Sequence, residues 1–398
     1  METPRPGPED ITNRENVESN VSMNNIAEKI KEDLACERMV PIQLIQNGGV
    51  IDFIKPRSAE ASLNENPYTG EDARLEQILE IADRPFCIIL AAHPQEREVI
   101  LKVRTREDPE HSARNEINFL KSIAPIIANA MLVEGHRLSN RIRFPRLIKS
   151  REEEVPTLCL ENYFQGRATG SIHRADIEVL TEQDIEDIAD FIDFFQSERV
   201  QIEIAKVLGD TGRKLLDFFG KYSDYLSRHR EKLISCVGED HVNSMNTILS
   251  DRQNFIQSGP KIFAARDINP SNIIKTESDE LAMIDWERCG VTNNPATEYG
   301  FLFVSLFSAP ELQEKLLRKI KLAHQDDPDF FERFRLDFIF FRGTGELNYW
   351  LNAQMIAESD AEREICQDAI ERLSQLMRDA IDKSGIWSED ETKPDKEF

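Results

Sequence analysis

The stretch that decides the fold is FAARDINPSNII, residues 263–274, followed by MIDWE, residues 283–287. Asp267 and Asn272 are five positions apart, and Asp285 lies thirteen positions beyond Asn272. Transfer of a phosphoryl group requires a carboxylate that orients the attacking hydroxyl and accepts its proton, together with hard oxygen ligands that hold magnesium against the phosphates. The two segments contain residue types suited to both tasks.

The local pattern predicts one small β-hairpin that brings these polar side chains together. Pro270 stiffens the first turn, and Ile273 begins a short strand. Residues 276–280 form a polar turn, and a second strand over residues 281–284 ends directly before Asp285. Each motif taken separately is also a common turn former, so simple turn chemistry is the alternative explanation.

In this order and spacing, RDINPSNII and IDWE resemble the catalytic and metal loops of the aminoglycoside phosphotransferase and choline kinase family. The resemblance implies that Asp267 is the catalytic base, that Asn272 is a magnesium ligand, and that Asp285 is the second, bridging magnesium ligand. It also implies an α+β, protein kinase-like two-lobe fold, with a small antiparallel β-rich N-terminal lobe and a larger helical C-terminal lobe. ATP and Mg²⁺ are the implied cofactors. The resemblance extends over about residues 80–380, and only these two motifs are specific.

Lys102 is the candidate ligand of the α- and β-phosphates, because VILKV, residues 99–103, is strand-like and matches the third-strand lysine pattern. Glu116 is the expected partner, since it shares a helical face with Ala113 and Leu120. A carboxylate directed inward requires a counter-charge. The alternatives are a solvated lysine on an exposed strand and a glutamate that reaches solvent at the edge of its stripe.

Residues 161–166, ENYFQG, occupy the position of the hinge between the lobes in this family. The resemblance therefore implies that adenine meets backbone groups near Glu161 and Tyr163. Gly166 is expected to serve the turn after the hinge rather than a ligand.

The sequence departs from the family pattern in two places. Ala265 stands where relatives carry a His two residues before the catalytic Asp, which puts the geometry of the loop in question. No glycine-rich phosphate loop precedes Lys102. Glu298 lies where relatives often carry an Asp that caps the following helix, so a structural role is expected for it. Trp286 and Glu287 replace the Phe-Gly of protein kinases, which favours the small-molecule branch.

Composition excludes several other classes of function. The chain has 398 residues, of which 40% are hydrophobic and 31% are charged, as in ordinary globular proteins. A formal charge of −24 argues against nucleic acid or an anionic membrane as the principal partner. The six cysteines and seven histidines are scattered, without metal-site spacing. No signal sequence or bilayer-spanning run is evident, so we expect a cytoplasmic protein.

The chain pattern predicts six segments. They are a disordered N-terminal segment (1–22), an extension of unclear role (23–75), an N-lobe (76–160), a hinge (161–166), a helical C-lobe with the catalytic and metal loops (167–387), and an acidic tail (388–398). Within the N-lobe, the apolar runs 86–92 and 98–104 predict an antiparallel hairpin. In the C-lobe, Thr181 begins a capping box, and amphipathic stretches predict further helices at 203–225, 240–257, 310–324 and 361–382.

Three functional interpretations follow from these patterns. The first is an ATP- and Mg²⁺-dependent phosphotransferase that acts on a hydroxyl of a small molecule. The second is a catalytically weakened, pseudokinase-like protein that binds nucleotide or regulates a partner. The third is nucleotidyl or other phosphoryl transfer on the same scaffold. The sequence does not identify the acceptor, because acidic residues such as Asp187, Asp190, Glu346 and Glu358 suit either an amine-bearing acceptor or solvated helix faces.

Overall fold

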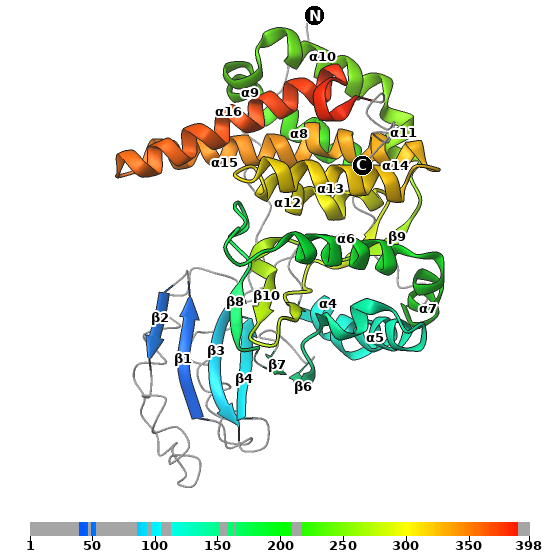
Figure 1. The fold of residues 1–398 in the computed structure, drawn as a ribbon, viewed down its shortest axis with the longest axis vertical. Coiled ribbons are helices and arrows are strands. Elements are labelled where there is room, and N and C mark those ends of the chain that lie inside the picture. Colours follow the sequence, from blue (N-terminus) through cyan, green and yellow to red (C-terminus); the bar gives the residue numbers. More distant parts are fainter. Residues whose placement is uncertain are drawn as a thin grey trace, which may run out of the picture. The chain divides into compact units, whose positions relative to one another are not determined.

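The structure is a computed structural model that describes residues 40–46, 49–52, 86–93, 97–104, 113–151, 158–162, 164–208 and 217–388. The chain divides into two compact units, each of which is described by itself. One contains the residues up to Glu107 together with Arg151–Leu158, and the other contains Asp108–Ser150 and Cys159–Phe398. The α+β class is confirmed, because strands dominate the described part of the first unit and helices the second (Figure 1).

Four antiparallel strands form the described part of the first unit. They are β1 (Val40–Gln46), β2 (Gly49–Asp52), β3 (Phe86–His93) and β4 (Arg97–Arg104), in the order β2-β1-β3-β4. The predicted hairpin is confirmed: β3 pairs with β4 from Phe86 opposite Arg104 to His93 opposite Arg97. Leu101 is fully buried while Lys102 is only half-buried, as expected for neighbours on opposite faces of a strand.

The second unit is mostly helical. Its helices are α4 (Ala113–Asn118), α5 (Ala124–Val133), α6 (Glu182–Gln196), α7 (Glu198–Leu208), α8 (Phe218–Arg228), α9 (Arg230–Val237), α10 (Glu239–Asp251), α11 (Gln253–Gln257), α12 (Glu298–Ser305), α13 (Pro310–Ala323), α14 (Pro328–Asp337), α15 (Gly343–Ile356) and α16 (Asp360–Asp382). Short 3₁₀ or π segments are η1 (Phe119–Ile123), η2 (Arg137–Asn140), η3 (Pro270–Asn272), η4 (Pro295–Thr297), η5 (Phe338–Arg342) and η6 (Gly385–Trp387). The remaining strands are β5 (Ile142–Arg143), β6 (Leu147–Arg151), β7 (Leu158–Asn162), β8 (Gly166–Ala168), β9 (Ile262–Ala264), β10 (Ile273–Thr276), β11 (Leu281–Met283) and β12 (Gly290–Thr292).

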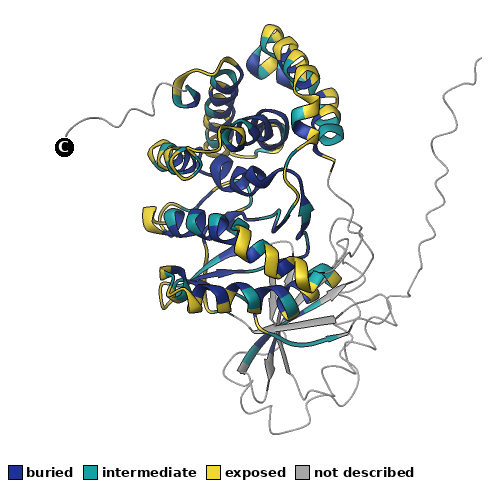
Figure 2. Cartoon of the chain, turned by 90° about the vertical axis from the view of Figure 1, so that its right-hand side faces the viewer, coloured by how far each residue is buried: buried dark blue, intermediate teal, exposed yellow. Residues whose placement is uncertain are grey.

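The predicted stretches 240–257, 310–324 and 361–382 agree with α10 and α11, with α13 and with α16. The predicted stretch 203–225 covers the end of α7 and the start of α8, and residues 209–216 between them lie outside the described residues. The capping box at Thr181 is present, with the Thr181 side chain on the backbone of Asp184 and the Asp184 carboxylate on the backbone of Thr181. The apolar face predicted for α6, including Ile188 and Phe195, is buried. Figure 2 shows the buried residues on the sides where the helices face one another, with exposed residues on the outer faces. Hydrophobic burial of these stripes is the main stabilising term.

The segment Ala113–Val133 is, within the described part of the chain, the one helix long and apolar enough to cross a membrane by length and composition alone. Half of its most apolar window is buried inside the protein. Ile117, Ile123 and Ile127 from this segment belong to the main hydrophobic core. The segment therefore meets the description of a core helix.

Several predictions fall outside the described residues or stay untested. The predicted disordered segment 1–22, most of the extension 23–75 and most of the tail 388–398 lie outside the described ranges. The six-segment division also stays a prediction. The described structure groups residues 108–150, which carry α4 and α5, with the helical unit.

Candidate active site

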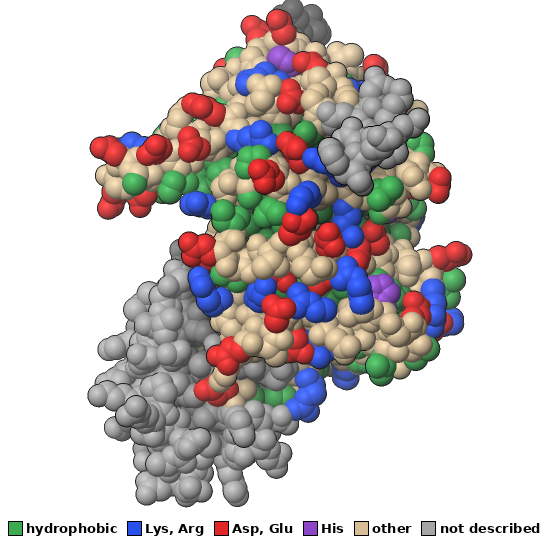
Figure 3. All heavy atoms as spheres, in the orientation of Figure 1, with side chains coloured by type: hydrophobic (Ala, Val, Ile, Leu, Met, Phe, Trp, Pro, Cys, Tyr) green, Lys and Arg blue, Asp and Glu red, His purple; other side chains and the backbone are tan. Residues whose placement is uncertain are grey.

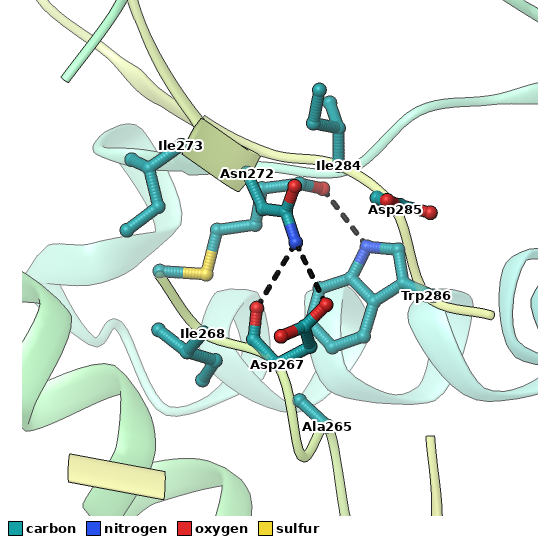
Figure 4. A pocket seen from close by; sticks show the side chains of 9 residues that line it. Ala265, Asp267, Ile268, Asn272, Ile273, Ile284, Asp285 and Trp286 are labelled. Carbon is teal, nitrogen blue, oxygen red and sulfur yellow. Dashed lines mark hydrogen bonds between the residues drawn. The ribbon is translucent and has the colours of Figure 1, made fainter. Parts of the chain in front are cut away.

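A small four-stranded sheet within the helical unit holds the segment that connects Asn272 to Asp285. Its order is β5-β11-β10-β8, and β10 pairs antiparallel with β11, with Ile273 opposite Met283. The backbone nitrogen of Ile284 donates to the carbonyl of Asn272 at 2.9 Å, which extends the pairing by one step. Asn272 and Asp285 therefore lie at the same end of one hairpin, as the sequence pattern predicts, and Asp267 lies beside Asn272 (Figure 4).

Asn272 is oriented by Asp267. Its side-chain nitrogen donates to the Asp267 carbonyl at 3.1 Å and to the Asp267 carboxylate at 3.3 Å. The amide oxygen of Asn272 consequently points away from Asp267 (Figure 4). Asn269 supports the same turn, because its side chain donates to the Asp267 carbonyl at 3.1 Å and accepts from the backbone nitrogen of Ser271 at 3.0 Å.

The Asp267 carboxyl is tuned toward proton acceptance. Burial raises its pKa above the ordinary value, and the charge of Asp285 raises it further. Arg288, three positions beyond Asp285, acts in the opposite direction, with its guanidinium 3.4 Å from the Asp267 carboxylate. A carboxylate with a raised pKa is a better general base than a fully solvated one. The sequence motifs gave no sign of Arg288.

Two residues of this site hold a left-handed backbone conformation. Arg266 has φ of 68° and Asp285 has φ of 64°. Such values are uncommon for residues other than glycine, and they cluster at active sites, where the surrounding structure enforces them. One of these strained residues directly precedes Asp267, and the other is Asp285 itself. Asp267 and Asp285 supply the two carboxylates of the predicted chemistry.

Glu298 holds the backbone directly before Asp267. Its carboxylate accepts the backbone N–H of Arg266 at 2.6 Å. This contact agrees with the structural role expected for Glu298, but it is not a helix cap: α12 begins at Glu298 without a side-chain cap, and the carboxylate binds the preceding loop. Burial raises the pKa of Glu298 to about 7, and one of its carboxylate oxygens has no hydrogen-bond partner among the described residues.

Glu298→Gln is expected to flatten the dependence of stability on pH. Because the folded-state pKa lies above the unfolded value of 4.5, the bound proton stabilises the folded protein at low pH, and this contribution is lost as pH rises through about 7. The loss amounts to about 3 kcal/mol. Urea unfolding between pH 4.5 and 8 should show this fall in the wild type and little of it in Glu298→Gln. Parallel profiles would contradict the prediction, and exposed Glu364→Gln serves as the control.

Glu116 is buried in the helical unit, as its place in the apolar stripe predicts. Its carboxylate accepts the backbone N–H of Trp286 at 3.2 Å, so it holds the residue that follows Asp285. Sequence reasoning missed this contact. Lys102 belongs to the other compact unit, and its pairing with Glu116 stays a prediction.

Trp286, the residue after Asp285, is held by packing and by a hydrogen bond of its side chain. Its indole stacks on Phe119, with ring centroids 3.7 Å apart and planes at 7°, and its Nε1 donates to the carbonyl of Met283 at 2.9 Å. The aromatic side chain at this position therefore anchors the residue after Asp285 to η1 through packing. This is a structural reason for Trp where protein kinases carry Phe.

A buried arginine lies beneath the catalytic loop. Arg342 ends the π segment η5 and lies over the rings of Phe301 and Phe341, at 3.5 and 4.3 Å from their centroids. Asp337 supplies the counter-charge at 3.7 Å, and the charge of Asp267 also acts on this guanidinium. Sequence reasoning missed Arg342, although a charged residue directly after the apolar run 338–341 is a visible signal.

An ion-pair cluster clamps the hairpin that carries Asn272 and Asp285. Lys275 on β10 lies 2.6 Å from the carboxylate of Asp184, whose side chain is fully buried, and 3.1 Å from Asp279. Arg141 bonds the same two carboxylates at 2.6 and 2.5 Å. Figure 3 shows basic and acidic side chains interleaved on this face of the helical unit, rather than separated by sign. The cluster ties the hairpin to α6.

Lys275→Met is expected to destabilise the protein by about 1–3 kcal/mol, because Asp184 would lose a charged partner inside the protein. Arg141 and Thr181 still bond Asp184, which limits the loss. Urea unfolding measures it, with Lys206→Met on the exposed face of α7 as the control. Equal unfolding free energies for the two variants would show that the clamp carries no net stability.

The structure describes only part of the predicted hinge, residues 161–166. Glu161 lies in β7, and Tyr163 lies outside the described residues, so adenine recognition there stays a prediction. Gly166 starts β8 and pairs with Thr276. A Cβ at Gly166 would collide with the backbone oxygen of Lys275, so the glycine is required for close approach of two strands.

The residues present fit a magnesium ion bound together with phosphates. Asp267, Asn272 and Asp285 line a hollow of about 10 Å³, room for roughly one water-sized body. Among the described residues, no group of three or more His, Cys, Asp or Glu side chains could hold a metal by itself. Mg²⁺ typically takes one or two carboxylates and completes its shell with water and substrate phosphates. The carboxylate of Asp285 and the outward-facing amide oxygen of Asn272 match that pattern.

No protein-family model and no curated protein matches the sequence. Similar solved structures include an aminoglycoside phosphotransferase from Alicyclobacillus acidocaldarius, at 11% identity and a TM-score of 0.45, with 76% of this chain and 90% of that chain covered. Choline kinase LicA from Streptococcus pneumoniae has 14% identity and a TM-score of 0.44, with 87% and 98% covered. A spectinomycin phosphotransferase, solved with ADP and spectinomycin, has 9% identity and a TM-score of 0.40, with 77% and 89% covered. These are the kinds of protein that the two sequence motifs resemble.

Proposed function

We propose that this protein is an ATP- and Mg²⁺-dependent phosphotransferase that moves the γ-phosphoryl group to a hydroxyl of a small molecule. The observation that carries the proposal is the convergence of Asp267, Asn272 and Asp285 at one end of the β10–β11 hairpin. The motif resemblance supports the same chemistry.

The proposed roles follow from the chemistry of each side chain. Asp267 orients the acceptor hydroxyl and takes its proton as the new P–O bond forms. Asn272 and Asp285 hold Mg²⁺, which when bound neutralises charge on the phosphates. Lys102 binds the α- and β-phosphates. Glu298 and Glu116 keep the two loops in position through backbone N–H groups of Arg266 and Trp286.

A kinase-fold binding protein with weakened catalysis is the second candidate. The observation that favours it is the contact of Arg288 with Asp267, because a cation beside the carboxylate makes it a weaker base. The same guanidinium supports catalysis if it turns to the transferred phosphoryl group, whose charge it would stabilise. Turnover therefore separates the two candidates.

Calorimetric titration of ATP with and without Mg²⁺ into the wild-type protein tests the proposal. We expect binding that requires Mg²⁺, and release of ADP when hydroxyl compounds are added. Binding without ADP release would favour the binding protein. Release of pyrophosphate instead of ADP would indicate nucleotidyl transfer. No binding of Mg-ATP would overturn the proposal.

A further inference from the structure

His173 and Glu346 form a hydrogen-bonded pair that the chemistry proposed above does not use. His173 Nδ1 lies 2.9 Å from Oε2 and 3.0 Å from Oε1 of Glu346. The imidazole also stacks on Tyr349, with centroids 3.4 Å apart and planes at 12°. Glu346 is buried, whereas the His173 side chain is 23% exposed. The ring is therefore fixed by a carboxylate and by an aromatic face, and part of it remains open.

The loop that carries His173 is attached to the catalytic loop. Thr169 donates from its backbone nitrogen to the carbonyl of Ile273 at 2.9 Å, and from its hydroxyl to the carbonyl of Pro270 at 3.0 Å. At the other end, Ala175 donates to the carbonyl of Ser305 at 2.9 Å. His173 thus lies on a short loop that is anchored at both ends, and its first end is hydrogen-bonded to Pro270 and Ile273 on either side of Asn272.

Glu346 is connected to the same site through Arg342, which precedes it by one helical turn. The guanidinium of Arg342 donates to the hydroxyl of Thr297 at 3.4 Å. The next residue, Glu298, accepts the backbone N–H of Arg266, directly before Asp267. The His173–Glu346 pair is thus joined to the Asp267 loop by a short chain of contacts within the helical unit.

The partner of Nδ1 decides the chemistry of the other ring nitrogen. When Glu346 is ionised, its carboxylate only accepts hydrogen bonds, so Nδ1 must donate to it, and in the neutral ring this arrangement leaves the lone pair on Nε2. A carboxylate behind a histidine fixes both the tautomer and the ring orientation. Among the described residues, all polar contacts of His173 go through Nδ1, so Nε2 is available as an acceptor.

We infer that His173 Nε2, oriented by Glu346, accepts a hydrogen bond from a donor group of the acceptor substrate, either a hydroxyl or an ammonium group. The inference rests on the proposed function and adds a specificity-determining residue to it. Asp267 acts on the hydroxyl that is phosphorylated, and His173 binds a second donor elsewhere on the same molecule. An acceptor that lacks this second donor leaves a polar group unpaired and is rejected.

The tautomer of His173 is the first test, and it requires no substrate. Protein labelled with ¹⁵N-histidine should show a resonance, assigned by its loss in His173→Gln, of a neutral ring protonated at Nδ1. Glu346→Gln should reduce this preference, and exposed Glu358→Gln should leave it unchanged. A ring protonated at Nε2, or a doubly protonated ring at neutral pH, overturns the inference because Nε2 could no longer accept.

Acceptor kinetics are the second test, with glycerol as the hydroxyl probe and ethanolamine as the ammonium probe. In the wild type, we expect one of them to shift the His173 resonance and to release ADP from Mg-ATP. His173→Gln should raise the KM of that compound about tenfold, which is the effect of losing one hydrogen bond. The factor by which KM rises should be larger than the factor by which kcat falls. His241→Gln, at the exposed pair with Asp382, is the matched control.

The outcomes separate this inference from the proposed function. An unchanged acceptor KM, or no shift of the His173 resonance with either probe, overturns the inference while Mg-ATP binding can still stand. A parallel loss of Mg-ATP affinity and kcat in His173→Gln also overturns it, since that pattern indicates a purely structural role. Absence of Mg-ATP binding in the wild type instead overturns the proposed function.

Discussion

Asp267→Asn is expected to lower the rate of phosphoryl transfer by about 10²–10⁴-fold, the usual contribution of a positioned general base. Asparagine keeps the size of the side chain and one oxygen that can accept from Asn272, so the loop geometry is retained. It has no basic carboxylate to take the proton of the acceptor hydroxyl. The measurement is ADP release from Mg-ATP in the presence of a hydroxyl acceptor.

Nucleotide affinity is the internal control for this variant. Because Asp267 acts on the hydroxyl, we expect the dissociation constant of Mg-ATP, measured by calorimetry, to stay within a few-fold of the wild-type value. A change of that size corresponds to less than about 1.4 kcal/mol of binding free energy. A variant that binds Mg-ATP normally and still turns over at the wild-type rate would remove Asp267 from the chemistry. The raised pKa of Asp267 predicts that activity falls as pH drops through this pKa, above the ordinary value near 3.8.

Asp285→Ala is expected to weaken Mg-ATP binding by at least about 100-fold. Loss of a residue that merely supports a metal ligand typically lowers affinity 10–100-fold, and Asp285 is proposed as a ligand itself. Binding of ATP without Mg²⁺ should change far less. Calorimetric titrations with and without Mg²⁺ separate the two effects.

A second substitution protects this test against a folding defect. Asp285 has φ of 64°, a conformation that asparagine tolerates better than alanine. Asp285→Asn therefore keeps the backbone and one oxygen while it removes the charge, and an intermediate loss of affinity is expected. Asp368→Ala, exposed on α16, is the surface control. Wild-type Mg-ATP affinity in both Asp285 variants would rule out the proposed metal role.

Local pattern was sufficient for much of the secondary structure. The β3–β4 hairpin, the Thr181 capping box and the strand–turn–strand that carries Asp285 all agree with the sequence-based predictions. Each depends on residues close together in the chain, where alternation, helical periodicity and turn chemistry act directly. The contacts that hold the site are different, because they join residues far apart in sequence.

Glu298 and Arg342 show why those contacts could not be predicted. The sequence placed Glu298 at the start of a helix, where a carboxylate is expected to cap, yet its carboxylate binds Arg266, 32 positions away. Arg342 follows an apolar run, and only packing decides that its guanidinium lies over Phe301 and acts on Asp267. Side-chain direction and burial arise from the whole core, which no local window contains.

The sequence by itself determined which residues form the candidate site. Asn272 and Asp285 flank one short hairpin and Asp267 lies five positions before Asn272, so chain connectivity alone brings the three residues together. The tertiary structure decided how these groups are held and tuned. Burial raises the pKa of Asp267, Glu298 fixes the loop, and the His173–Glu346 pair joins residues 173 positions apart beside it. The physical reason is that desolvation and long-range hydrogen bonds exist only once distant segments pack.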